Sequence, residues 1–254
     1  MAYAFRSQIL EETGSTNAEA FKHAEAGEAG PLWIMALRQT EGRGRSGRRW
    51  TSDRGNLYAS RLQRLQCPQS NVHQLSLLTG VAVVEAIAVA AQKAIPGVRL
   101  KWPNDVLIGR DKCAGILAES QSWGQRSEIV IVLGIGINLA SHPTDAGQPV
   151  THLAAHGVTV MPETMLAALA ASTDRWIEIW DGGVGFERVR TAWLEHGSAV
   201  GERLTINTGR ERIAGTFLGL DGSGALLLRD EDGTQRTLAY GDVTVTAPDS
   251  EGRD

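Results

Sequence analysis

Cysteine is scarce in this sequence, and an excess of basic charge is absent. Cys67 and Cys113 are the only 2 cysteines among 254 residues, so at most one disulfide can form and a disulfide-rich extracellular scaffold is excluded. The formal net charge at pH 7 is −4, so no overall positive field attracts DNA or RNA. We therefore predict a cytoplasmic protein that does not bind DNA and meets charged partners only at local sites.

Signals for secretion and for membrane insertion are also missing. The residues after Met1 show no charged region leading into an apolar core, so no secretory signal peptide is expected. The most apolar run, Leu75 to Ala91, is slightly short for a membrane span and carries Glu85. We interpret it as a buried helix, and we predict no membrane partner.

Hydrophobic periodicity predicts alternating helices and strands over most of the chain. Four helices are expected, over Asn17 to Ala26, Leu75 to Lys93, Met161 to Trp180 and Phe186 to His196. Strands are expected over residues 33–38, 56–62, 98–102, 105–108, 113–120 and 128–139.

The sequence pattern changes near Gly197. The sequence shows no internal repeats and no glycine-rich linkers. Short β-like runs follow, separated by Asp221-Gly222 and Asp232-Gly233, and Asp-Gly favours tight hairpins. Such a run of short strands predicts a small barrel-like β domain. The expected organisation is a domain over residues 1–196, a β domain over 197–247 and a frayed tail over 248–254.

The segment "EGRGRSGRRW", residues 41–50, contains the G-x-G-x-x-G pattern of a dinucleotide-binding turn. Such a turn needs a helix after it to hold the pyrophosphate, and residues 50–55 show no helical periodicity. No P-loop motif occurs in the chain. The arginines of the segment instead suit carboxylates or phosphates. Two interpretations remain: a loop that closes over a small anionic ligand, or a solvated basic turn.

Three further motifs combine glycine and polar residues at predicted strand ends. They are "KWPND" at residues 101–105, "DKCAGILAES" at 111–120 and "GIGINLA" at 134–140. Taken singly, each is typical of a structural feature: a proline turn, a lysine at a strand edge and a strand cap. Their order and spacing carry more information than any one of them.

"GRGRSGRRW", "KWPND", "KCAGILAE" and "GIGINL" resemble the successive signatures of the biotin–protein ligases. "STN" at residues 15–17 and Gln39 fit the same family, and the agreement runs from about Ile9 to Ala140. The resemblance implies an α/β (α+β) catalytic domain, a mixed β-sheet flanked by helices as in class II synthetases, followed by an SH3-like barrel. Some relatives carry an N-terminal DNA-binding domain; with "STN" at residue 15 we expect a ligase without repressor function.

The family reaction, as the resemblance implies it, has two steps. The carboxylate of biotin attacks the α-phosphate of ATP, with Mg²⁺, and gives biotinyl-5′-adenylate and pyrophosphate. A lysine of a biotin carboxyl carrier protein domain then attacks the adenylate and releases AMP. ATP, Mg²⁺ and biotin are thus the expected small molecules, with no tightly bound prosthetic group. The carrier domain is the expected partner, and a homodimer is possible through an exposed sheet edge.

The resemblance also carries roles to individual residues. Lys112 and Arg45 are predicted to be catalytic, with the Lys112 ammonium between the biotin carboxylate and the α-phosphate. The predicted biotin contacts are Ser15, Thr16, Asn17, Gln39, Arg43, Gly44, Arg45, Lys112 and Gly115. The predicted nucleotide contacts are Arg48, Trp50, Asn104, Asp105 and Asn138, and no metal ligand is assigned.

Several of these residues have structural alternatives. Ser15 and Thr16 could cap the first helix, Trp50 could be a core residue, and Lys112 could be an exposed strand-edge lysine. The sequence also departs from the family where Thr246 stands, since some relatives carry an arginine there.

Two other functions are kept as alternatives. A lipoate–protein ligase shares the adenylate chemistry but needs a long apolar tunnel for an acyl chain, and the arginine–glycine loop and "KWPND" favour biotin. A nonenzymatic, biotin-sensing regulator is disfavoured by the acidic balance of the chain.

Overall fold

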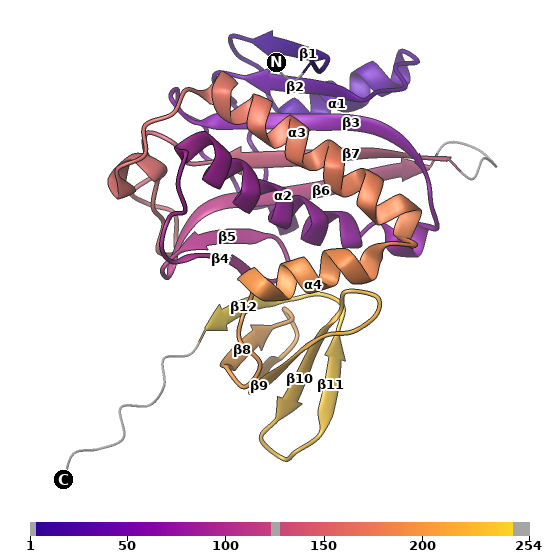
Figure 1. Ribbon diagram of the computed structural model, residues 1–254, viewed down its shortest axis with the longest axis vertical. Helices are drawn as coiled ribbons and strands as arrows, with labels where there is room; N and C mark the ends of the chain where they lie inside the picture. The colour runs from indigo at the N-terminus through magenta and orange to yellow at the C-terminus, as the bar shows by residue number, and fades with distance from the viewer. Residues whose placement is uncertain (1–3, 123–127, 246–254) are drawn as a thin grey trace.

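A seven-stranded mixed sheet is the centre of the computed structural model, which describes residues 4–122 and 128–245 (Figure 1). The strand order is β1-β2-β3-β7-β6-β5-β4. β1 and β2 are parallel and the other neighbours are antiparallel. The strands are β1 (Ser7–Leu10), β2 (Leu32–Ala36), β3 (Leu57–Gln66), β4 (Val98–Lys101), β5 (Asp105–Ile108), β6 (Asp111–Ser122) and β7 (Glu128–Ile137).

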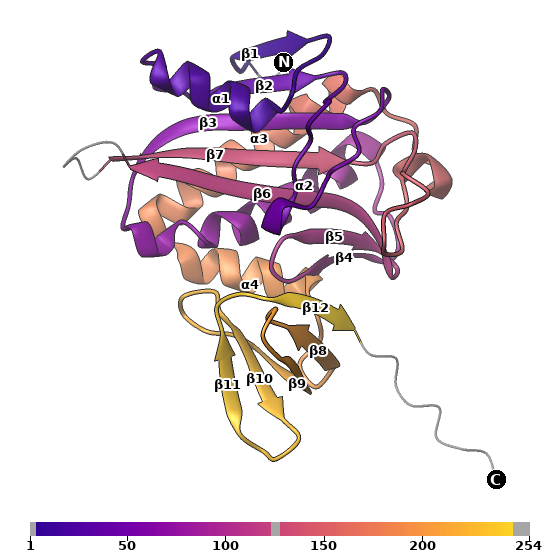
Figure 2. The same cartoon turned by 180° about the vertical axis from the view of Figure 1, so that it is seen from behind.

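Helices cover both faces of this sheet. α2 (Gln74–Ala91) and α3 (Pro162–Trp180) cross one face (Figure 1), and α1 (Thr16–Glu25) lies on the other (Figure 2). Two separate apolar clusters match this arrangement, with Trp33 of β2 in one and Ile34 in the other, because successive strand residues point to opposite faces. The predicted mixed sheet flanked by helices is therefore confirmed.

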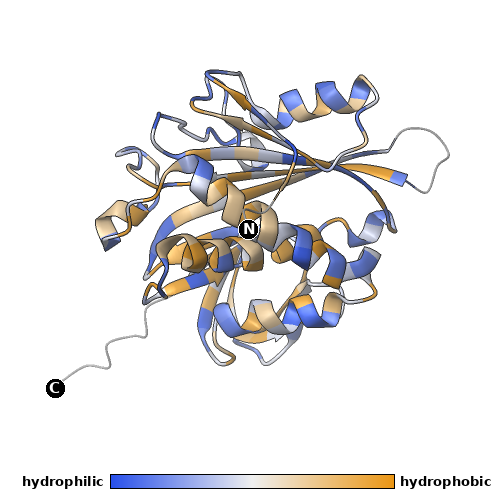
Figure 3. Cartoon of the chain, turned by 45° about the horizontal axis from the view of Figure 1, so that its top comes forward, coloured by the Kyte–Doolittle hydropathy of each residue, from blue (hydrophilic) through white to orange (hydrophobic). Residues whose placement is uncertain are grey.

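The apolar run that was predicted to be a buried helix is α2. The segment Gln69–Ala91, which includes this helix, is long and apolar enough to cross a membrane. However, 67% of its apolar 18-residue stretch is buried inside the protein. Glu85 faces α3, where its carboxylate accepts a hydrogen bond of 2.9 Å from Trp176 Nε1. The helix ends at Ala91, and the next residue, Gln92, has a left-handed φ of 54°. Figure 3 shows hydrophobic and hydrophilic residues side by side on the helices, as expected for elements with one buried face.

The C-terminal region is a second, five-stranded antiparallel sheet below the first (Figure 1). Its order is β11-β10-β9-β8-β12, and the predicted small β domain after the large sheet is confirmed. The strands are β8 (Arg203–Asn207), β9 (Arg212–Leu220), β10 (Leu226–Asp230), β11 (Gln235–Leu238) and β12 (Asp242–Val245).

The two Asp-Gly hairpins form where the sequence predicts them. Asp221 Oδ1 accepts the backbone N–H groups of Ser223 and Ala225 at 2.8 and 2.9 Å, and the second hairpin lies between β10 and β11. α4 (Phe186–His196) contacts both α2 and β9. The domain boundary near Gly197 stays a prediction, and Thr246 and the predicted tail lie outside the described residues.

Candidate functional site

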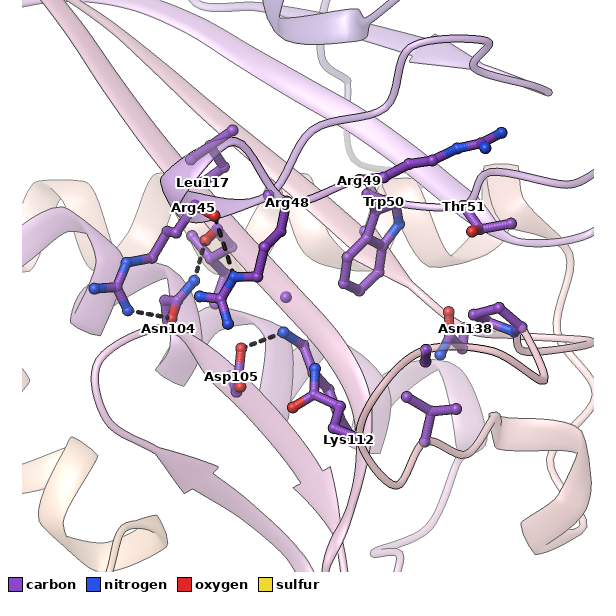
Figure 4. A pocket seen from close by; sticks show the side chains of 18 of the residues that line it. Arg45, Arg48, Arg49, Trp50, Thr51, Asn104, Asp105, Lys112, Leu117 and Asn138 are labelled. Carbon is purple, nitrogen blue, oxygen red and sulfur yellow. Dashed lines mark hydrogen bonds and ion pairs between the residues drawn. The ribbon is translucent and has the colours of Figure 1, made fainter. Parts of the chain in front are cut away.

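A cavity of about 800 Å³ lies over the strand ends of the large sheet. Its walls come from the N-terminus of α1, the loop of residues 42–51, the adjoining ends of β5, β6 and β7, residues 143–150, and β12 of the C-terminal sheet. Figure 4 shows its charged part. All fourteen site residues predicted from the sequence line this one cavity. They are Ser15, Thr16, Asn17, Gln39, Arg43, Gly44, Arg45, Arg48, Trp50, Asn104, Asp105, Lys112, Gly115 and Asn138.

One part of the cavity, which we call the neutral end, is formed by Ser15, Thr16, Asn17 and Gln39. The backbone N–H of Thr16 donates to Gln39 Oε1 at 2.8 Å, and the Thr16 hydroxyl lies 3.1 Å from the same oxygen. Ser15 stands at the N-cap position of α1, but no side chain caps the helix there. The capping alternative is therefore wrong, and these hydroxyl and amide groups are arranged around the cavity instead.

Asn17 is held from two sides at the neutral end. Its Nδ2 donates to Glu119 Oε2 at 2.7 Å and to Leu117 O at 3.3 Å. A Cβ on Gly134 of β7 would lie 2.2 Å from Asn17 Oδ1, so glycine is required at that position. Arg43 reaches the same carboxylate, with its Nη2 3.3 Å from Glu119 Oε2.

The charged end consists of Arg45, Arg48, Asp105 and Lys112. Lys112 Nζ lies 2.5 Å from Asp105 Oδ1, and Lys101 Nζ lies 3.0 Å from Asp105 Oδ2. The Lys112 side chain is only 13% exposed, so it is not an exposed strand-edge lysine. Figure 4 shows the Lys112–Asp105 pair below the arginine loop.

Burial and pairing act in opposite directions on these two groups. Burial lowers the pKa of Lys112, and the neighbouring Asp105 offsets this only in part. Burial alone would raise the pKa of Asp105, but the ammonium groups of Lys112 and Lys101 lower it overall. Asp105 is thus held as a carboxylate, and Lys112 is an ammonium whose proton is more weakly held than that of a solvated lysine.

The arginine loop is folded against the C-terminal sheet. Arg45 Nη1 donates to Asn104 Oδ1 at 3.1 Å and also approaches Gly241 O at 3.4 Å. Arg48 Nη2 donates to Asp242 Oδ1 at 3.0 Å. Arg49 points away from this group in Figure 4. The predicted closing of the loop on a ligand stays a prediction.

Trp50 lies on the floor formed by β6 and β7. A Cβ on Gly136 would lie 2.5 Å from Trp50 Nε1, and a Cβ on Gly115 would lie 2.9 Å from Trp50 Cζ3. Both glycines therefore make room for the indole in this structure. Lys112 Nζ is 5.3 Å from the ring centroid, within cation–π range. Trp50 is partly exposed and lines the cavity, so the core alternative is wrong.

Asn104 and Asn138 support backbone as well as the cavity wall. Asn104 Nδ2 donates to Ile116 O at 2.6 Å, and Asn138 Nδ2 donates to Thr151 O at 3.0 Å.

Both cysteines are free, and Cys113 is fully buried, as predicted for a small apolar residue.

Several contributors were missed by sequence reasoning. Lys101 begins the quoted motif "KWPND", and its positive charge next to a proposed anion site could have identified it. Glu119 also stood inside a quoted motif, at the end of "KCAGILAE", but its contact with Asn17 could not be read from the motif. Ser60 and Asp242 lay outside the motifs quoted above, and each reaches the site through a distant segment of the chain. Within residues 4–122 and 128–245, no group of 3 or more His, Cys, Asp or Glu side chains could hold a metal ion.

Comparisons with known proteins place the chain in a family. Residues 9–138 match the biotin/lipoate A/B protein ligase family, and residues 199–245 match the biotin protein ligase C-terminal domain. The biotin–[acetyl-CoA-carboxylase] ligase of Paracoccus denitrificans is 40% identical over 234 residues, covering 89% of this chain and 95% of that protein. The enzyme of the same name from Mycobacterium tuberculosis is 30% identical over 242 residues, covering 92% of this chain and 87% of its own.

A solved structure shares the same fold. The biotin protein ligase from Aquifex aeolicus in complex with biotin and ATP superposes with a TM-score of 0.78 at 27% identity, covering 96% of this chain and 99% of that one. The chain therefore belongs to the biotin/lipoate A/B protein ligase family, and to the biotin protein ligases within it.

Proposed function

We infer that this chain is a biotin–protein ligase that forms biotinyl-5′-adenylate from biotin and ATP and transfers the biotinyl group to a lysine of a carrier protein. The observation that carries the inference is the pairing, in one cavity, of a neutral hydrogen-bonding end with a charged end built around Lys112. Biotin has the matching polarity, since it carries a neutral ureido group at one end and a carboxylate at the other.

The neutral end is proposed to bind the ureido group. Ser15 and Thr16 are only 8% and 3% exposed, so the neutral end is shielded from water, and we propose that a ureido group bound there is buried. A buried ureido group then needs protein partners for its N–H and C=O groups. Hydroxyl and amide side chains provide both donors and acceptors without adding charge. Asn17, Gln39, Gly44 and Gly115 complete the proposed biotin contacts.

The charged end is proposed to join two anions that repel each other. The biotin carboxylate and the α-phosphate can approach only where cations offset their charge. Lys112 and Arg45 stand around this part of the cavity, and Arg43 reaches Glu119 beside the neutral end. In the free protein the partners of these three cations are Asp105, Asn104, Asp242 and Glu119. Substrate anions would take the place of these internal partners. Arg48, Trp50, Asn104, Asp105 and Asn138 are proposed to contact the nucleotide.

The two chemical steps follow from this placement. A carboxylate oxygen of biotin attacks the α-phosphorus, the bond to the bridging oxygen breaks, and pyrophosphate leaves with both electrons of that bond. The carrier lysine, as a neutral amine, then attacks the biotinyl carbonyl carbon and AMP leaves, while the amine loses one proton. Lys112 stabilises the negative charge that builds up at the α-phosphate during the first step.

Mg²⁺ would enter with ATP rather than occupy a protein site of its own. The one deeply buried carboxylate at the charged end, Asp105, already pairs with two lysines. An ion held mainly by phosphate oxygens and water fits this lining. When bound, Mg²⁺ would neutralise phosphate charge; the protein residues would supply orientation and the remaining positive charge.

The proposed partner is the biotin carboxyl carrier domain of an acetyl-CoA carboxylase, the enzyme in the names of both curated relatives. We place the protein in the cytoplasm, where its two free thiols stay reduced. A homodimer would form at an edge of the large sheet, such as β1, where Ile9 is 50% exposed.

Incubation with biotin, ATP, Mg²⁺ and a carrier domain tests the proposal. We expect pyrophosphate release that depends on biotin, followed by addition of one biotinyl group to the carrier by mass spectrometry. A carrier that lacks the acceptor lysine is the control for the second step. Lipoate in place of biotin tests the first alternative, and faster pyrophosphate release with lipoate would overturn the proposal. Binding of biotin without any labelling of the carrier would favour the regulator.

A further inference from the structure

Ser60 lies beneath the neutral end without lining the cavity. It is on β3, paired with Ile34 of β2 and Gly134 of β7, and it is fully buried. Its Oγ is 2.7 Å from Thr16 Oγ1 and 2.6 Å from Asn17 Oδ1. A buried hydroxyl that touches both of these residues can control how they present hydrogen-bonding groups to a ligand.

The direction of each hydrogen bond in this group is set by Glu119. A carboxylate only accepts, so the Asn17 carboxamide must turn its Nδ2 toward Glu119 Oε2, 2.7 Å away. The Asn17 Oδ1 atom therefore faces Ser60, and the single proton of the Ser60 hydroxyl must be donated to it. Ser60 Oγ then has no proton left for Thr16 Oγ1, 2.7 Å away, so we infer that the Thr16 hydroxyl supplies the proton of this second contact.

Thr16 consequently faces the cavity as an acceptor. Its hydroxyl proton has two acceptors inside the protein, Ser60 Oγ at 2.7 Å and Gln39 Oε1 at 3.1 Å. Ser60 is the nearer of the two, and Gln39 Oε1 already accepts the Thr16 backbone N–H. The lone pairs of Thr16 Oγ1 remain for a ligand, which must therefore offer an N–H or O–H donor.

We propose that Ser60 is a positioning residue that fixes Thr16 as a hydrogen-bond acceptor and thereby selects a ligand with a ureido-type N–H. The proposal rests on the proposed biotin site. A dithiolane ring, as in lipoate, has no donor to offer Thr16, so the same device discriminates against it. Ser60 acts through Thr16 and Asn17 and does not touch the substrate itself.

Steady-state pyrophosphate release with biotin and ATP varied in turn tests the proposal. For Ser60→Ala we expect KM for biotin to rise about fivefold to tenfold, as for the loss of one net hydrogen bond. KM for ATP and kcat should change less than about twofold, because the charged end is untouched. Ser172→Ala, which removes another buried serine hydroxyl outside the cavity on α3, is the matched control and should leave KM for biotin unchanged.

A second measurement separates positioning from general damage. Biotin methylated at its ureido nitrogens has no N–H for Thr16, so wild type and Ser60→Ala should bind this analogue with affinities within about twofold by calorimetry. Equal losses for biotin and the analogue would overturn the proposal, as would an unchanged affinity for biotin. Ser60→Cys, which replaces the hydroxyl with a somewhat larger and much weaker hydrogen-bonding thiol, takes the place of Ser60→Ala if the alanine variant does not fold.

Biotin binding measured by calorimetry without ATP also tests the role of Ser60 separately from the ligase function. A wild-type protein that binds biotin but releases no pyrophosphate would contradict the ligase function, and the Ser60 variants would still report on Thr16. A wild-type protein that binds no biotin would overturn both.

Discussion

The neutral and charged ends of the cavity are built in different ways. At the neutral end, Thr16, Asn17 and Gln39 are locked by hydrogen bonds to buried protein atoms, and glycine at position 134 is required by the close approach of Asn17. At the charged end, cations of the arginine loop and of β6 are held by carboxylates such as Asp105 and Asp242.

This difference separates recognition from chemistry. Hydrogen bonds to a neutral group depend on direction, so their partners must be fixed before the ligand arrives. Attraction between charges depends mainly on distance, so cations can be held by internal carboxylates and then exchange these for substrate anions. We therefore expect substitutions at the neutral end to affect biotin binding, and substitutions at the charged end to affect the adenylation rate and the use of ATP.

The largest expected effect is that of Lys112→Ala. Loss of one preorganised cation at the site of developing charge costs about 3–4 kcal/mol, or about 10²–10³ in the rate of adenylate formation. Single-turnover formation of biotinyl-adenylate measures it, with Lys93→Ala, an exposed lysine after α2, as the control. Biotin affinity should change little. An adenylation rate close to that of the wild type would remove Lys112 from its catalytic role.

A smaller effect is expected for Arg45→Ala. A hydrogen bond to a charged group contributes about 1.5–3 kcal/mol, so we expect adenylation to fall by about tenfold to a hundredfold, with a higher KM for ATP. Arg49 belongs to the same loop but points away from the charged group (Figure 4). Arg49→Ala should therefore lose less than about threefold. Equal losses in the two variants would mean that the loop acts through its overall charge.

Thr16→Val tests the neutral end by removing one hydroxyl at nearly constant volume. KM for biotin should rise about fivefold to tenfold, while KM for ATP stays within about twofold, because Thr16 does not contact the arginine loop. Initial-rate kinetics with each substrate varied provide both constants. A comparable rise in KM for ATP would show that the two ends are not separable.

The smallest effect near neutral pH concerns the proton of Lys112. Because burial lowers the pKa of this ammonium below the ordinary 10.5, despite Asp105, its charge is lost as pH rises through the lowered value. kcat/KM for biotin should then fall on the alkaline side earlier than an exposed lysine would cause. Lys101 and Arg48 also face this group and lower its pKa further. Lys112→Arg should abolish the alkaline fall, since arginine stays charged; if the fall persists, another group is responsible.

Much of the fold was predictable because local patterns are strong in this chain. The apolar run that begins at Leu75 is long and uninterrupted, and α2 starts one residue earlier, at Gln74. The Asp-Gly turns indicate both C-terminal hairpins because the aspartate side chain binds backbone within its own turn. The small C-terminal β domain was predictable from its short strands and turns, but its strand order was not, because the pairing of β8 with β12 joins strands that are far apart in the sequence.

The site was predictable where the motifs themselves line the cavity, as for Gln39 and Lys112. It was not predictable for residues that act from a distance. Ser60 is 43 positions from Asn17, and Asp242 is 194 positions from Arg48. Ser60 lies in β3, a strand that mixes apolar and polar residues, and Asp242 opens the short strand β12. Neither has a local pattern that links it to the cavity.

The sequence alone determined which chemical groups the protein has: arginines on a glycine-rich loop, a lysine at the start of a strand, and hydroxyl and amide groups near the N-terminus. Only the tertiary structure decided their state, because hydrogen-bond direction and charge pairing depend on neighbours brought together by the sheet. Glu119 and Ser60 make Thr16 an acceptor, and Asp105 holds Lys112 in place. These contacts are properties of the folded chain, since the groups that make them are far apart in the unfolded one.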